Sequence, residues 1–250
     1  MQRKGQLAII IIVVIVIIVV IGLFFGFRNK NIQPDIQVVD AEVQEVYDFV
    51  VDCIEETGEE AVYEVGRQGG YYEIPENTFI IGFPYYVFEG ENKMPTKQLI
   101  EQEIAKYVDE NLEDCIIDFV DFPDYNINSG EIASRAVINQ KNVEIDVFYD
   151  LDIRKENTKF SLKNFDNIII PIRLGEIYDI AEQVVGLQLE DLNNICVSCL
   201  IEIAEENDLF IPVESYTENI FIYHIIEDLQ NPEKFNYDFV FAVELKGEEE

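Results

Sequence analysis

The most distinctive chemistry in this sequence belongs to its four cysteines, two of which lie close together as Cys196-Val197-Ser198-Cys199. This spacing is typical of a thiol–disulfide redox motif or of half a zinc site. A zinc site needs two further ligands, and neither a second pair of this kind nor a nearby histidine accompanies the motif. A redox motif would need its reactive cysteine at a helix N-terminus and in contact with solvent.

The residues around this pair favour a structural interpretation instead. They recur at the spacing of one buried helix face: Leu192, Ile195, Leu200 and Ile203. This pattern places Cys196 and Cys199 in the middle of a helix. We therefore predict that the pair is buried or forms a structural bridge, with redox chemistry and metal binding as the alternatives.

The other two cysteines, Cys53 and Cys115, are predicted to form a disulfide. Each lies on the apolar face of one of two predicted helices that can pack as an antiparallel pair. A bridge that closes a loop of roughly 60 residues stabilises a fold by about 4 kcal/mol in the chain-entropy model. The alternative is a pair of free thiols buried as small apolar side chains.

Three other features could carry chemistry, and each has a simpler structural interpretation. The glycines of residues 66–70 follow a predicted helix, whereas a phosphate-binding loop opens one, so we predict a helix end and a turn. His224 is the only histidine and is predicted to occupy a core position. The tyrosine pairs at 71–72 and 85–86 suit either a groove or ordinary sheet packing.

The segment Asp124-x-Asn126-x-Asn128 begins like a calcium-binding loop. An EF-hand needs glycine at its sixth position and glutamate at its twelfth, where this chain has Ser129 and Arg135. We predict a polar turn between a helix and a sheet. A looser cage of oxygen ligands that includes Asp118 or Asp121 is the alternative.

The elements that must position these residues alternate between helices and strands. An amphipathic helix is predicted over residues 39–54, with an extension to Val65, and a second begins after Thr96 as its N-cap. Apolar residues alternate with acidic ones along residues 143–153, within an antiparallel meander at 131–172. Further segments complete the prediction: helices at 177–185 and 189–204, and β structure at 78–88, 220–226 and 235–245.

This order predicts an α+β fold in which amphipathic helices pack on an antiparallel sheet. The domain is expected to cover residues 31–250, with a division into subdomains 31–125 and 126–250 left open.

An N-terminal transmembrane helix is predicted to precede the domain, as part of a membrane anchor over residues 1–30. Residues 7–27 contain no charge, amide or hydroxyl. A helix of this length spans about 30 Å, which is the thickness of the bilayer core. Cleaved secretory signals have shorter apolar cores and a small-residue cleavage site, so we expect this segment to remain as an anchor.

The charge distribution predicts on which side of the membrane the domain lies. All 50 acidic residues lie at or beyond Asp35, whereas four of the 17 basic residues lie at or before Lys30. Anionic lipid of the inner leaflet would repel such a domain, so we expect a cytoplasmic N-terminus and an extracytoplasmic domain. The acidic surface also argues against nucleic acid as a partner.

The residues before the apolar run, Arg3-Lys4-Gly5-Gln6, resemble the class III signal of archaeal pilins and archaellins, which is cut after the glycine. The cut would fall between Gly5 and Gln6, although Ile10 stands where such pilins commonly have glutamate. Several short segments of the domain, together with this N-terminal start, resemble uncharacterised single-span archaeal membrane proteins. The segments lie at residues 53–58, 66–71, 111–115, 195–200 and 239–242. The resemblance implies an envelope protein with a pilin-like leader, and it implies no activity.

The expected function is that of a membrane-anchored cell-envelope protein with a structural or interaction role, and not that of an enzyme. The expected partners are the lipid bilayer and other envelope proteins or copies of the chain itself, and no cofactor or metal is expected. Three alternatives stay open: an extracytoplasmic module that binds a ligand or calcium, a pilin-like filament subunit, and a thiol-redox enzyme.

Overall fold

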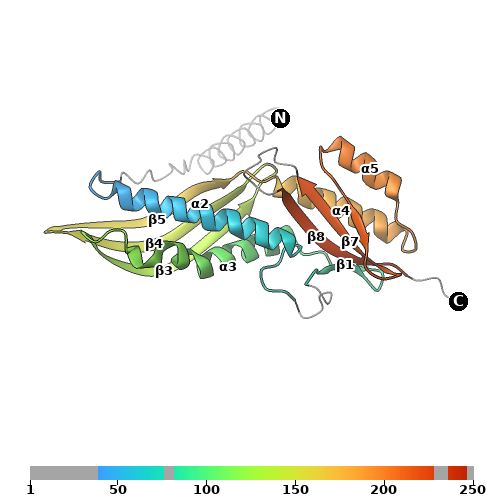
Figure 1. Ribbon diagram of the computed structural model, residues 1–250, viewed down its shortest axis with the longest axis horizontal. Coiled ribbons are helices and arrows are strands. Elements are labelled where there is room, and N and C mark those ends of the chain that lie inside the picture. Colours follow the sequence, from blue (N-terminus) through green and yellow to red (C-terminus); the bar gives the residue numbers. More distant parts are fainter. Residues whose placement is uncertain (1–38, 76–81, 228–235, 247–250) are drawn as a thin grey trace, which may run out of the picture. The chain divides into compact units, whose positions relative to one another are not determined.

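The computed structural model describes residues 39–75, 82–227 and 236–246. The predicted anchor at residues 7–27 and the predicted leader site at Gly5 and Gln6 lie outside these ranges. Among the described residues, no helix combines the length and the apolar character needed to cross a bilayer. The described residues from Val39 onward belong to one compact unit of α+β architecture, which is the predicted fold class (Figure 1).

Two long helices pack against each other and follow the predicted amphipathic pattern. Helix α2 (Gln44–Arg67) and helix α3 (Lys97–Ile116) each bury one apolar face. The Thr96 hydroxyl accepts a hydrogen bond from the Leu99 N–H at 3.2 Å, so Thr96 caps α3 as predicted. Helix α2 contacts β4 and β5 of one sheet and β8 of the other (Figure 1).

The smaller sheet is the predicted antiparallel meander, in the order β3-β4-β5. Its strands are β3 (Asn126–Ile138), β4 (Val143–Lys155) and β5 (Thr158–Ile170). Alternate residues of β4 from Val143 to Ile153 are buried under the helices, as the alternating sequence predicts. The Gly58 Cα of α2 lies so close to this sheet that an added Cβ would stand 2.6 Å from the Ile145 Cδ1 atom.

Helix α3 also covers the outer edge of β3. The Asp109 carboxylate accepts the Ser134 N–H at 2.6 Å, and the Glu101 carboxylate accepts the Ile138 N–H at 2.9 Å. These bonds satisfy backbone donors that an edge strand otherwise leaves free to pair with another chain.

The larger sheet has the order β2-β1-β8-β7-β6. Its strands are β1 (Tyr85–Phe88), β2 (Glu91–Asn92), β6 (Val213–Ser215), β7 (Ile220–Glu227) and β8 (Tyr237–Glu244). Strand β1 pairs in parallel with β8, so the sheet is not purely antiparallel as predicted. The two strands lie far apart in sequence, and no local pattern records such a pairing.

The segment predicted as a single helix over residues 189–204 is divided in the structure. Helix α4 (Leu174–Glu190) ends before Asp191, and helix α5 (Val197–Glu206) begins six residues later. The Asp191 carboxylate accepts the N–H groups of Asn193 and Asn194 at 3.0 and 3.2 Å. These bonds replace the helical hydrogen bonds that the backbone would otherwise form. They explain why the helix ends here although the apolar residues keep their helical spacing.

One main hydrophobic cluster joins the helices and both sheets. It includes Val50 of α2, Ile104 of α3, Val147 of β4 and Phe239 of β8. The cluster takes residues from both sides of position 125, where the sequence left a subdomain boundary open.

Candidate functional site

The Cys196–Cys199 pair lies at the start of a helix. Cys196 is the N-cap residue of α5, Cys199 is in the first turn, and the Leu200 N–H donates to the Cys196 carbonyl at 3.1 Å. The two sulfurs form a disulfide with 5.3 Å between the Cα atoms. The predicted position in the middle of a helix is therefore wrong. That position was the reason for preferring a structural interpretation over a redox interpretation, so the reason no longer holds.

The disulfide is open to solvent on one side. Cys196 is exposed and Cys199 is half-buried. Beside them, the side chains of Val197 and Ile201 are also turned outward, with 62% and 54% of their surfaces exposed. Helix α5 is therefore anchored through Leu200 and Ile203 while it presents the disulfide and two apolar residues on its outer side.

A hollow of about 330 Å³ lies next to Cys196, between α4, α5 and β7. Among the residues that line it are Leu187, Gln188, Ile195, Cys196, Leu200 and Tyr223.

The polar groups of this hollow are held in place. The buried Tyr223 hydroxyl donates to the Gln188 Oε1 atom at 2.8 Å. The Gln188 Nε2 atom donates to the carbonyls of Asp191 and Asn194 at 2.6 and 3.1 Å, so this side chain supports the loop that leads into Cys196. Burial raises the pKa of Tyr223, so its hydroxyl is protonated at neutral pH and remains a hydrogen-bond donor.

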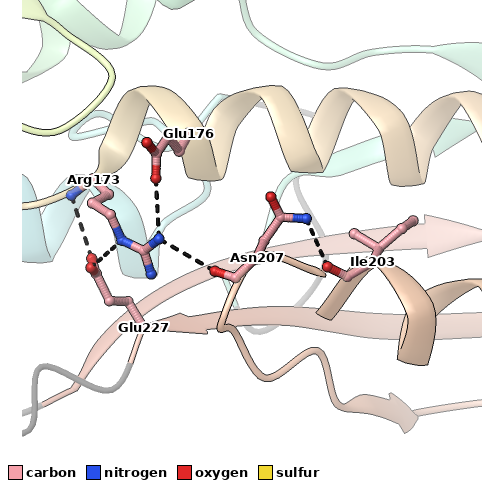
Figure 2. A network of polar contacts seen from close by, with 5 residues as sticks. All are labelled: Arg173, Glu176, Ile203, Asn207 and Glu227. Atoms are coloured by element: carbon pink, nitrogen blue, oxygen red, sulfur yellow. Dashed lines mark hydrogen bonds and ion pairs between the residues drawn. The ribbon is translucent and has the colours of Figure 1, made fainter. Parts of the chain in front are cut away.

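The opposite end of α5 is fixed by a network around Arg173. The Arg173 Nε atom donates to the buried Glu227 carboxylate at 2.5 Å, and Nη1 donates to Glu176 at 3.1 Å (Figure 2). The same Nη1 atom donates to the Asn207 carbonyl at 3.3 Å, and the Asn207 side chain donates to the Ile203 carbonyl at 2.8 Å. The network joins the start of α4, the end of α5 and the end of β7.

Two electrostatic features act at the disulfide. The first turn of a helix carries partial positive charge, which stabilises a thiolate there. Residues 187–211 contain six carboxylates and no lysine or arginine. One basic residue from elsewhere in the chain, Lys246, lies beside this segment, because its backbone N–H donates to the carbonyl of Leu192 at 2.8 Å. Hydrogen bonds from Asn193 and Asn194 lower the pKa of Asp191, which lines the hollow as a carboxylate at neutral pH.

The other disulfide joins Cys53 of α2 to Cys115 of α3, which is the pairing that the sequence favoured. Cys53 is buried, with 2% of its surface exposed, and Cys115 is half-buried. The alternative of two free thiols is not observed. This bridge ties together two helices whose cysteines are 62 residues apart.

The glycine-rich segment at residues 66–70 is a helix end and a turn, as predicted. The Gly70 N–H donates to the Val65 carbonyl at 2.7 Å, and Gly69 has a φ of 59°. The buried Tyr86 hydroxyl donates to the Gly69 carbonyl at 2.9 Å.

Of the two tyrosine pairs, one residue of each packs in the fold and the other lines a hollow, so both predicted interpretations apply in part. Tyr86 packs in the core, and Tyr72 packs edge-to-face on Tyr107 with 5.0 Å between the ring centroids. In contrast, Tyr71 and Tyr85 line a hollow of about 390 Å³.

The calcium-like segment does not form a turn over its whole length. Asn126 and Asn128 lie in β3, and the Asn128 amide donates to the Asn126 side chain at 3.3 Å. Within the described parts of the chain, no group of three or more histidine, cysteine or acidic side chains is placed to hold a metal ion.

His224 lies on β7 with its side chain partly exposed, so the predicted core position is only partly correct. Its Nδ1 atom lies 3.0 Å from the Asp238 Oδ2 atom on the neighbouring strand. The hydrogen bond to Asp238 raises the pKa of His224, although partial burial opposes the shift. The pair is a cross-strand contact of the larger sheet.

Comparison of the chain with models of known protein families, with curated proteins and with solved structures gives no match.

Sequence reasoning missed the surroundings of the Cys196–Cys199 site. Gln188 and Tyr223 meet only through packing of α4 on β7, which no spacing in the sequence indicates. One signal was present, since Asp191, Asn193 and Asn194 are side chains that commonly form local turns. Weighting that cluster above the apolar spacing would have placed Cys196 at a helix start.

Proposed function

We propose that this chain is a membrane-anchored cell-envelope protein whose domain lies outside the cytoplasm and has a structural or interaction role. The observation that carries the proposal is the disulfide between Cys53, which is buried in the core of the domain, and the half-buried Cys115. Structural disulfides persist in oxidising compartments and are rare in the cytosol. The four cysteines of the chain, all at described positions, are all paired.

Two features of the sequence support the membrane part of the proposal. Residues 7–27 are long and apolar enough for a spanning helix, and the strongly acidic remainder suits the outer side of an anionic membrane. The partners we propose are the lipid bilayer and other envelope proteins or further copies of the chain. A pilin-like subunit is the form of this role in which the leader is removed between Gly5 and Gln6.

The test is to treat intact cells that make the protein with a protease that cannot enter them. We expect the domain to be digested while a cytoplasmic marker stays intact, and the protein to resist extraction from membranes by alkaline carbonate. A domain that is digested only after lysis, or a chain released by carbonate, would overturn the proposal.

A second measurement distinguishes the two forms of the anchor. The intact mass of the chain extracted from membranes reports whether it begins at Gln6 or at Met1. A start at Gln6 supports the pilin-like form, and a start at Met1 supports a plain uncleaved anchor.

A further inference from the structure

The two disulfides of the chain differ in what they hold together. Cys53–Cys115 connects two neighbouring helices, α2 and α3, through cysteines that are 62 residues apart in the sequence. Cys196–Cys199 connects residues three apart that the first turn of α5 already holds close together. Opening this second bond separates no elements of the fold, because α5 remains anchored through Leu200, Ile203 and the Arg173–Asn207 contact. A surface disulfide of this kind is suited to thiol–disulfide exchange and contributes little to the stability of the fold.

We infer that Cys196–Cys199 is a redox-active disulfide that exchanges with a protein partner whose reacting segment carries two cysteines among apolar and basic residues. The inference goes beyond the proposed role and adds a chemical reaction to it. Its test does not depend on which side of the membrane the domain lies.

The positions of the two sulfurs set the order of the exchange. A thiolate of the partner attacks the exposed Cys196 sulfur, a new sulfur–sulfur bond forms there, and the half-buried Cys199 leaves as a thiolate at the start of α5. The partner's second thiolate then attacks the partner sulfur of the mixed disulfide and displaces Cys196. The partner dithiol loses two electrons and two protons and becomes a disulfide, while Cys196 and Cys199 gain them as two thiols.

The surface beside the disulfide suits an apolar segment. The hollow of about 330 Å³ opens next to Cys196, and its apolar lining includes Leu187, Ile195 and Leu200. Val197 and Ile201 add a second apolar surface on the outer side of α5, where both are more than half exposed. A chain that lays apolar side chains here brings a neighbouring cysteine to the Cys196 sulfur.

The charge around the site favours a basic segment. Six carboxylates and no basic residue lie within residues 187–211, and Asp191 lines the same hollow as Cys196. Lys246 lies beside this segment, with its N–H bonded to the Leu192 carbonyl, and its single positive charge offsets only part of this negative charge. An anionic thiol approaching Cys196 is repelled, whereas a thiol on a cationic molecule is attracted. Between exposed charges in water, an attraction or a repulsion of this kind changes a rate by up to about five-fold for each unit charge.

The first experiment uses the full-length protein in detergent and mild reduction without denaturant. Dithiothreitol is expected to open Cys196–Cys199 and leave Cys53–Cys115 intact, which alkylation and peptide mass mapping will report. In parallel, cysteamine, which is attracted, is expected to react up to about 25-fold faster at low salt than 3-mercaptopropionate, which is repelled, each rate being divided by its rate on a small neutral disulfide. The difference is expected to shrink as salt is added.

The second experiment compares two single variants, Cys199→Ser and Cys196→Ser, against a short peptide with one cysteine flanked by leucine and lysine. The peptide thiol is activated as a mixed disulfide with thionitrobenzoate, whose release is coloured. Cys199→Ser keeps the exposed sulfur and is expected to react about tenfold faster than Cys196→Ser, which keeps the half-buried one. Thermal melting of both variants checks that each is folded.

Several results would overturn the inference. One is a Cys196–Cys199 bond that opens only after denaturation. Another is equal peptide reactivity of the two folded variants, which would remove the assigned order of attack. A preference for 3-mercaptopropionate over cysteamine would remove the basic partner. None of these outcomes bears on the location of the domain, so they are separate from the test of the proposed function.

Discussion

Removal of the Cys53–Cys115 disulfide is expected to be the most damaging small change to this domain. The cysteines are 62 residues apart, and closing a loop of this length restricts the unfolded chain by about 4 kcal/mol. Whole domains are stabilised by only about 5–15 kcal/mol, so the bond accounts for a large share. For a domain of this size, 1 kcal/mol corresponds to roughly 2–4 °C in the melting temperature. We therefore expect a decrease of roughly 8–16 °C.

The assay is thermal unfolding of the full-length protein in detergent, followed by circular dichroism. The variant is Cys53→Ala with Cys115→Ala, because alanine avoids a buried hydroxyl at the nearly inaccessible position 53. The matched control is Cys196→Ala with Cys199→Ala. Its disulfide joins residues three apart, and the same relation gives only about 1–2 kcal/mol.

The reasoning is refuted if both double variants lose the same stability. It is also refuted if the Cys53–Cys115 variant melts within about 3 °C of the parent, which is well below the chain-entropy value.

Three further changes test individual contacts. Arg173→Gln leaves the buried Glu227 carboxylate without its charged partner and is expected to cost about 3 kcal/mol in the free energy of unfolding, measured by urea titration. Asp238→Asn removes the partner that raises the pKa of His224. The contribution of this pair to the free energy of unfolding is full below about pH 6.5 and is lost as the pH rises through the raised pKa. The loss of stability in the variant is therefore expected to be larger at about pH 5.5 than at about pH 9. Gly69→Ala places a Cβ 2.5 Å from the Val240 carbonyl oxygen at a φ of 59°, and is expected to lower stability by about 2 kcal/mol or more in the same titration.

Each of these changes has a control within the chain. Lys97→Gln breaks an ion pair with Asp179 that is more exposed, and a loss equal to that of Arg173→Gln would contradict the effect of burial. Gly186→Ala adds a Cβ in open space on α4 and is expected to stabilise by about 0.5–1 kcal/mol, so a loss there would undermine the argument for Gly69. For Asp238→Asn, an equal loss at both pH values would mean that ionisation of His224 is not involved.

Periodic patterns predicted the parts of the fold in which each element buries one face. Alternation along β4 indicated its buried side, and the apolar faces of α2 and α3 indicated that Cys53 and Cys115 could meet. These predictions succeed because burial of a repeating face is a property of the segment itself. The predicted anchor at residues 7–27 rests on the same kind of local signal and stays a prediction.

The candidate site was predicted less well, because competing local signals had to be weighed. Apolar spacing continues through Leu192 and Ile195 as though one helix passed through them. The Asp191 side chain nevertheless accepts hydrogen bonds from the backbone N–H groups that follow it, and α4 ends there. A separate helix, α5, begins after Cys196. The energies of a helical hydrogen bond and of a side-chain turn are similar, and packing decides between them.

The sequence by itself therefore determined the α+β class, the two amphipathic helices, the antiparallel meander and the presence of a close cysteine pair. Only the tertiary structure decided that β1 pairs in parallel with β8, that Gln188 meets Tyr223, and that Cys196 stands exposed at the start of a helix. The physical reason is the range of the interactions. Periodicity and capping act within a few residues, whereas strand partners and the lining of a hollow come from segments that only the folded chain brings together.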